Sequence, residues 1–134
     1  MTTPLWCLVI VMFLPVPLAM FGGYFRGKAF GKADNKEPRL QAAKLDGIGA
    51  RAYAAQQNAW EATGIFTVAV VVTHLAGLPA DVAAPWTIGF VVMRVLHSIL
   101  YLTNIEMARS GAFLGSCPLY KSYAADETHS LISR

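Results

Sequence analysis

The chain has 134 residues, enough for one domain (1–134) and no more. Hydrophobic residues make up 55% of it and charged residues only 14%, against roughly 25% charged in ordinary soluble domains. A soluble protein this small could not hide so much apolar surface from water, so the composition predicts a membrane protein. The net charge of +3 identifies no partner by itself; its distribution along the chain is more informative.

The first apolar block, at about 5–25, contains no charged residue before the arginine at its end. A helix needs about 20 apolar residues to cross the hydrocarbon core, so this block predicts a span. No basic residue precedes it and no small-residue cleavage site follows it, so we expect a retained span rather than a secretory signal. Pro15 and Pro17 each lack a backbone donor and predict a bend in the helix.

Residues 26–46 form a loop in which basic side chains outnumber acidic ones. The basic residues are Arg26, Lys28, Lys32, Lys36, Arg39 and Lys44. By the positive-inside rule this loop is expected in the cytoplasm and the N-terminus outside, in a multi-pass integral membrane protein. Without interleaved aromatic residues the loop does not indicate nucleic acid, although its charge could attract an anionic substrate.

Two further apolar blocks predict spans at about 47–77 and 84–105, joined by a short connection that makes them antiparallel neighbours. After Arg109 the apolar stretch 110–120 is only about half the length that a bilayer requires, and a polar tail follows from about 118. We therefore expect an all-α membrane fold with three clear spans and a short or partial fourth.

Polar residues recur at helical spacing inside the second and third predicted spans. They are Arg51, Asn58 and Glu61 in the second, and Arg94, His97, Tyr101 and Asn104 in the third. At about 100° per residue each set falls within roughly 80° of its helix, so each forms one stripe. The two stripes belong to neighbouring helices and are expected to face one another.

Arg94 lies near the middle of its block, where an unpaired charge costs at least about 2.5–3.5 kcal/mol. It should therefore face the bundle. Glu61 is the only carboxylate within any predicted span, and is the expected acceptor in the same or a neighbouring subunit. The pair could simply join helices, but two polar stripes together favour a binding cavity for a small anionic ligand, with an apolar wall for a hydrophobic one.

These residues also form known motifs. The segment 51–61 reads R-A-x-x-A-x-x-N-x-x-E, and 94–102 reads R-x-x-H-x-x-x-Y-L. With Lys28-Ala29-Phe30 in the loop, they resemble the MAPEG superfamily (membrane-associated proteins in eicosanoid and glutathione metabolism), in its microsomal glutathione transferase and prostaglandin E synthase branch. The resemblance covers roughly residues 5–115.

The resemblance implies a homotrimer of four-helix subunits, a transferase or peroxidase that uses glutathione as cosubstrate at subunit interfaces and acts on a hydrophobic small molecule, a lipophilic electrophile. It implies a glutathione site made of Arg26, Arg51, Asn58, Glu61, Arg94, His97 and Tyr101. Arg109 and Ser110 resemble the Arg-Ser pair that activates the thiol in some members, which implies a catalytic role because the thiolate is the nucleophile. No metal site is expected, since the two cysteines lack metal-ligand spacing.

Two other functions are considered. A MAPEG-fold protein that binds lipid or another ligand without catalysis is favoured by Gln57, which stands where active relatives often have a second arginine. A small multidrug-type transporter is the third hypothesis and the weakest. Such transporters place an essential carboxylate in the first span, and the first predicted span here has none.

Overall fold

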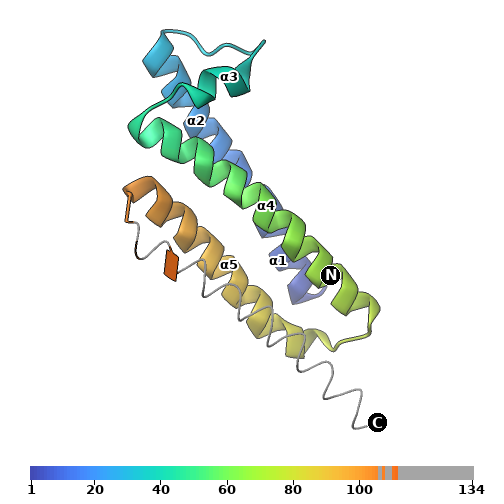
Figure 1. Cartoon of the computed structure of the whole chain (residues 1–134). Coiled ribbons are helices and arrows are strands. Elements are labelled where there is room, and N and C mark those ends of the chain that lie inside the picture. The colour runs from blue at the N-terminus through green and yellow to red at the C-terminus, as the bar shows by residue number, and fades with distance from the viewer. Residues whose placement is uncertain (106, 108–109, 112–134) are drawn as a thin grey trace.

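A computed structural model describes residues 1–105, 107 and 110–111 of the chain. Within these residues the backbone is helical and contains no strand (Figure 1), which confirms the predicted all-α fold. The helices are α1 (Thr3–Phe13), α2 (Pro15–Phe30), α3 (Pro38–Ala43), α4 (Gly47–Leu75) and α5 (Ala80–Thr103). The stretch 112–134, with the expected partial fourth element and polar tail, lies outside the described residues.

Helices α1 and α2 continue one another, with an interruption at Leu14. Pro15 causes it, because proline has no N–H to donate to the carbonyl oxygen of Val11 four residues earlier. The Val11 oxygen instead lies 3.2 Å from the Leu14 nitrogen and 3.2 Å from the hydroxyl oxygen of Thr63 on α4. The Thr63 oxygen also lies 2.8 Å from the Ala59 carbonyl of its own helix. The single hydroxyl proton is therefore shared between the Ala59 carbonyl and the Val11 carbonyl, which the Leu14 N–H also reaches.

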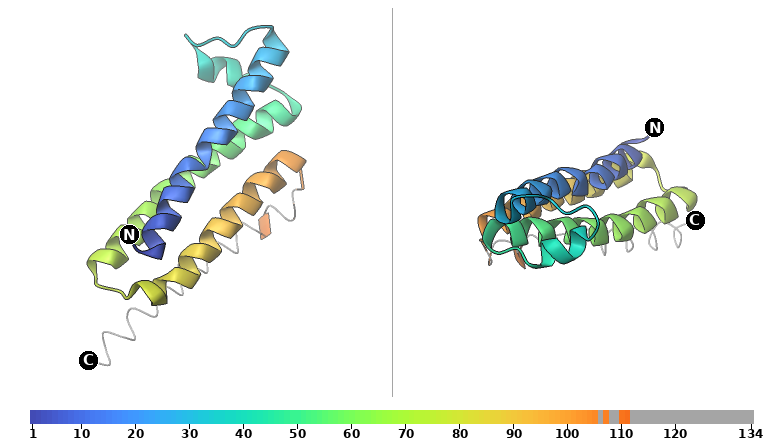
Figure 2. Two further views of the ribbon diagram at one scale, coloured as in Figure 1. Left: turned by 180° about the vertical axis from the view of Figure 1, so that it is seen from behind. Right: turned by 90° about the horizontal axis from the view of Figure 1, so that it is seen from above.

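Helix α4 packs closely along α2 because the first half of its buried face consists of small residues. These are Gly49, Ala52, Ala55, Ala59 and Ala62, and small residues let membrane helices approach closely. At Gly49 a Cβ atom would lie only 3.1 Å from the Cβ of Phe25, so any larger residue would push α2 and α4 slightly apart at this crossing. Both views of Figure 2 show α4 alongside the α1–α2 rod, with α3 at the far end of the pair.

Helix α5 runs antiparallel to α4 and packs against α1 and α4 (Figure 1). It begins at Ala80, ahead of the predicted start at 84. Pro85 is tolerated inside because the bond it removes would reach the carbonyl of Asp81, in the exposed first turn where solvent can replace it. Phe90 of α5 stacks on Phe66 of α4 with ring centroids 4.2 Å apart, beside the apolar core around Val70.

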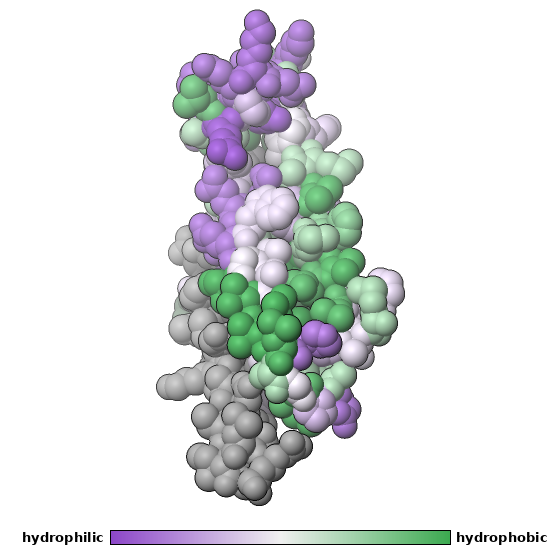
Figure 3. Space-filling view, turned by 90° about the vertical axis from the view of Figure 1, so that its right-hand side faces the viewer, coloured by the Kyte–Doolittle hydropathy of each residue, from purple (hydrophilic) through white to green (hydrophobic). Residues whose placement is uncertain are grey.

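Two helical rods among the described residues are long and apolar enough to cross a membrane: Thr3–Phe30 and Ala80–Thr103. They correspond to the first and third predicted spans. Helix α4 has 29 residues, which is sufficient length, but polar residues interrupt its apolar sequence, and a crossing by α4 stays a prediction. Figure 3 shows hydrophilic surface gathered at the end that carries α3 and hydrophobic surface over the middle of the molecule.

The contact between Thr63 and Val11 makes the first prediction. Thr63→Val keeps the side-chain shape but removes the hydroxyl, leaving the Val11 carbonyl without its interhelical donor. Because interhelical hydrogen bonds in membrane proteins contribute about 0.6–1.7 kcal/mol, the free energy of unfolding should fall by about that amount. Reversible unfolding in sodium dodecyl sulfate, followed by circular dichroism, measures the change.

Thr67→Val is the matched control, because the Thr67 hydroxyl binds only the carbonyl of Thr63 in its own helix, at 2.7 Å. Its loss should cost less. In a Pro15→Ala background the restored N–H can donate to Val11, so the cost of Thr63→Val should shrink. An equal cost in both backgrounds would contradict this account of the proline break.

Candidate functional site

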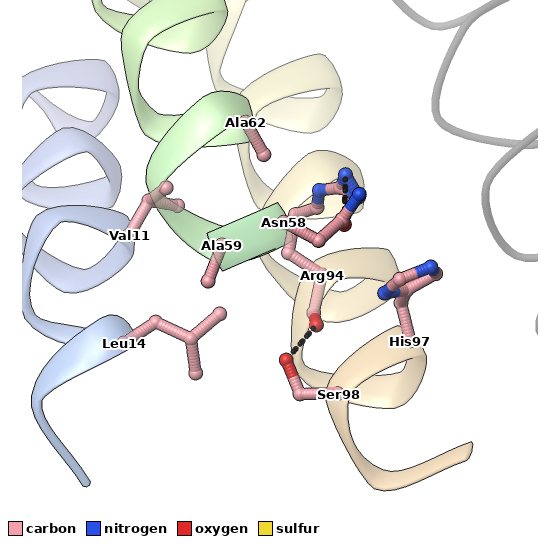
Figure 4. A pocket seen from close by; sticks show the side chains of 8 residues that line it. All are labelled: Val11, Leu14, Asn58, Ala59, Ala62, Arg94, His97 and Ser98. Carbon is pink, nitrogen blue, oxygen red and sulfur yellow. Dashed lines mark hydrogen bonds between the residues drawn. The ribbon is translucent and has the colours of Figure 1, made fainter. Parts of the chain in front are cut away.

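The centre of the candidate site is a hydrogen-bonded contact between α4 and α5 (Figure 4). The guanidinium nitrogens Nη1 and Nη2 of Arg94 donate to the side-chain oxygen of Asn58, at 3.3 and 3.4 Å. Arg94 is only 5% exposed. The expectation that Arg94 faces the bundle and finds an acceptor there is therefore met.

The acceptor is Asn58 and not Glu61, which is exposed in the structure. Both residues lie on α4 and the difference between them is rotational. Three residues turn a helix by about 300°, so Glu61 is offset by about 60° from Asn58. This offset takes Glu61 from the side of α4 that faces α5 to the open surface of the chain.

Aromatic residues lie against the Arg94 side chain, and a serine bonds its backbone. Its Cζ atom lies 5.7 Å from the ring centroid of Phe90, a favourable position for a cation over an aromatic face, and Phe90 is itself fixed by stacking on Phe66. One turn later, the hydroxyl of Ser98 donates to the Arg94 carbonyl at 3.0 Å. Phe90 and Ser98 were not predicted as site residues. Their spacing of four residues before and after Arg94, which puts them on its helix face, is the sequence feature that could have identified them.

His97 and Tyr101 continue the polar face of α5 towards the α3 end. Their rings lie 5.7 Å apart, edge to face, with His97 buried and Tyr101 half-buried. Asn58, Arg94 and His97 line one hollow with Ser98 and the apolar side chains of Val11, Leu14, Ala59 and Ala62. The structure thus brings together four predicted site residues: Asn58, Arg94, His97 and Tyr101.

This hollow is small. The space between its atoms leaves no room for a water molecule, whereas ligand pockets measure roughly 300–1,000 Å³. A tripeptide therefore cannot lie inside the described chain between α4 and α5. Any ligand of these residues must approach from the outer edge, where Tyr101 and Glu61 are accessible.

The other predicted site residues lie apart from this hollow. Arg51 donates from Nε to the carbonyl of Leu102 at 3.2 Å, so it binds the C-terminal end of α5, where carbonyl groups lack helical partners. Arg26 donates to the carbonyls of Asp34 and Pro38, each at 3.2 Å, and so holds the loop between α2 and α3.

The two predicted catalytic positions fall at the edge of what the structure describes. Ser110 is exposed, and Arg109 lies outside the described residues. Asn104, the last member of the α5 stripe, ends the helix in a left-handed conformation with φ of 62° and is exposed. Within the described chain no group of His, Cys, Asp and Glu could hold a metal ion.

Two of the described helical rods are long and apolar enough to cross a membrane, and a buried arginine–asparagine contact between α5 and α4 gives the helical bundle an internal polar site. The sequence model of the MAPEG family matches residues 3–118, so the chain belongs to the MAPEG family. No curated protein and no solved structure matches the chain. The family supplies the general context of glutathione and eicosanoid metabolism in membranes.

The Asn58–Arg94 contact predicts energetic coupling between α4 and α5. Asn58→Leu, Arg94→Leu and the double variant form a cycle in which the two single effects should not add. The coupling should be about 0.6–1.7 kcal/mol, the range of interhelical hydrogen bonds in membranes. Unfolding in sodium dodecyl sulfate measures it.

Gln57→Leu paired with Arg94→Leu is the control cycle, because Gln57 is exposed and does not line the hollow. Its coupling should be near zero. A coupling as large as that of Asn58 would show that the cycle reports a general change in α4 and not the hydrogen bond.

Proposed function

We propose that the protein is a membrane-bound, glutathione-dependent transferase that acts on lipophilic electrophiles. Membership of the MAPEG family supports the general setting. The observation that carries the proposal is the Arg94–Asn58 contact on the same helix face as His97 and Tyr101. Both guanidinium donors converge on the Asn58 oxygen, so this contact orients the Arg94 side chain. An oriented cation suits the carboxylates of glutathione and a developing thiolate.

A second copy of the chain completes this proposed site. Glu61 is exposed on α4, on the same helix face as the apolar side chains of Ile65 and Val68, four and seven residues later, which are 63% and 60% exposed. A carboxylate facing lipid near the level of Arg94 would be costly. Packing of this face against a neighbouring subunit removes the cost and places Glu61 where it can accept from the ammonium group of glutathione. The homotrimer implied by the resemblance fits this need.

The proposed reaction is nucleophilic substitution or addition by the thiol of glutathione. The thiol loses its proton, and the sulfur forms a bond to an electrophilic carbon of a substrate that enters from the lipid; in a substitution the leaving group departs with the bonding electrons. In this proposal Asn58, Glu61, Arg94, His97 and Tyr101 hold glutathione, while Arg109 and Ser110 stabilise the thiolate.

The proposed orientation has the α3 end in the cytoplasm and the N-terminus outside, with α4 also crossing the bilayer. The basic side chains of the loop 26–46 support it, because this loop and the beginning of α4 lie at the same end of the molecule (Figure 1). Water-soluble glutathione would then reach the outer edge of the site from the cytoplasm, close to Tyr101.

A second candidate function is binding of a lipid or another ligand by the MAPEG fold without catalysis. Gln57 favours it, because a neutral side chain stands where the resemblance gives active relatives a second arginine. One positive charge fewer is then available to hold the carboxylates of glutathione. This function predicts ligand retention but no thiolate absorbance when glutathione is added.

Binding and turnover are the direct test of the proposed transferase. Titration calorimetry of protein in nanodiscs should show glutathione binding with a millimolar or lower Kd, and the protein should conjugate a chlorinated nitrobenzene with release of chloride. Glutathione in which the thiol is methylated is the control, because it should bind without forming product. Absence of binding at millimolar glutathione would overturn the proposal, and binding without turnover would favour the second candidate.

Two substitutions separate binding from thiol activation. Arg94→Ala should weaken glutathione binding about 10- to 100-fold, as expected for the loss of a charge-assisted hydrogen bond, and should also lower stability. Arg109→Ala should leave folding and binding intact but reduce turnover about 100-fold, as when one donor to a developing anion is lost. Normal activity in both variants would refute the residue assignment.

A further inference from the structure

A second, larger hollow lies on a different side of α4 from Asn58. It is a groove of about 440 Å³ between the last turns of α2, the short helix α3 and the first half of α4. We infer that this groove binds the headgroup and the upper acyl chain of an anionic membrane phospholipid. The inference goes beyond the proposed transferase function, because the groove contains none of Asn58, Glu61, Arg94, His97 and Tyr101; of the residues that the resemblance assigns to glutathione, only Arg26 lines it.

The charge of the groove favours an anion. Two arginines, Arg26 and Arg39, line it, and the lining includes no aspartate or glutamate. Arg26 donates to two backbone carbonyls, which fix the guanidinium but carry no formal charge. The nearby carboxylate of Asp34 is turned into its own loop, where it accepts from the backbone nitrogen of Lys36 at 2.8 Å.

The α2 part of the lining away from Arg26 is apolar and has little side-chain bulk. It consists of Ala19, Gly22 and Gly23, while α4 contributes Trp60 together with the polar side chains of Tyr53, Gln56 and Gln57. A Cβ atom at Gly22 would meet no atom within 4 Å, and one at Gly23 would meet only Arg26, at 3.9 Å. Open space beside a helix backbone is suited to a chain of methylene groups.

The position of the groove selects an amphiphile rather than a soluble anion. It lies where the apolar rod Thr3–Phe30 ends and the polar α3 end of the molecule begins (Figure 3). Trp60 lines it and is 51% exposed, and tryptophan is enriched at the level of lipid headgroups. The bilayer supplies such a ligand at high local concentration, with its phosphate near Arg26 and Arg39 and its chain along Gly22.

Fluorescence of Trp60 tests this inference. The chain has three tryptophans, so Trp6→Phe and Trp86→Phe leave Trp60 as the only reporter. Full-length protein in phosphatidylcholine nanodiscs is doped with phosphatidylglycerol or phosphatidylcholine that carries bromine on the acyl chain, which quenches a nearby tryptophan. Brominated phosphatidylglycerol should quench Trp60 more strongly at equal mole fraction, and Arg39→Gln should reduce this preference about five-fold.

Matched variants separate the groove from the general charge of the loop. Lys32→Gln removes the same charge from the same loop, outside the groove, and should keep the preference. Gly22→Leu should fill the groove and abolish quenching while the fold is retained. Circular dichroism verifies folding, and Arg39→Gln alters only an exposed side chain.

Four results would overturn the inference. One is equal quenching by both lipids. Another is an equal loss of preference in Lys32→Gln and Arg39→Gln. Protection of Trp60 from both lipids would show that a second copy of the chain covers the groove. If millimolar glutathione relieved the quenching, the groove would be a glutathione site and not a lipid site. Because glutathione binding and conjugation are measured separately, loss of the lipid preference leaves the proposed transferase function standing.

Discussion

An arginine in the middle of an apolar helix has to be satisfied inside the bundle, and most of the arrangement around it follows from this constraint. Arg94 reaches Asn58 on α4, and this contact fixes the rotation of α5 relative to α4. His97 and Tyr101, three and seven residues later, then lie on the same side of α5 as Arg94. The aromatic stack of Phe66 and Phe90 holds the two helices together one turn before Arg94 on α5.

Two backbone carbonyl groups that lack their regular helical partner accept hydrogen bonds from side chains of α4. Pro15 leaves the Val11 carbonyl open, and the Thr63 hydroxyl lies within hydrogen-bonding distance of it. Arg51 performs the corresponding role for Leu102 at the end of α5. In both cases a side chain of α4 binds a backbone carbonyl of a neighbouring helix. In hydrocarbon an unsatisfied carbonyl is costly, so these contacts are specific links and not incidental ones.

The helical fold and the polar helix faces could be predicted from the sequence, because both depend on the spacing of residues that are close together in the chain. Apolar length predicts spans, and 3.6-residue spacing predicts which residues share a face. The partner of Arg94 could not be read in this way. Asn58 and Glu61 belong to one stripe and differ by about 60° around the helix axis. Which of them faces Arg94 is set by the rotation of α4, and that rotation depends on how the small residues of α4 pack on α2. The groove of Arg26 and Arg39 was also missed, since the folding of the loop creates it.

Helix α4 separates two polar environments. Asn58 faces α5 across a packed hollow, while Tyr53, Gln57 and Trp60 face the groove beside α2 and α3. Gln57 is adjacent to Asn58 in sequence, but consecutive residues are about 100° apart on a helix, so the two side chains serve different surfaces. A second arginine at position 57, as the resemblance suggests for active relatives, would add its charge on the groove side of α4. In this chain the charge of the groove comes from Arg26 and Arg39 instead, and the Asn58–Arg94 contact is independent of it.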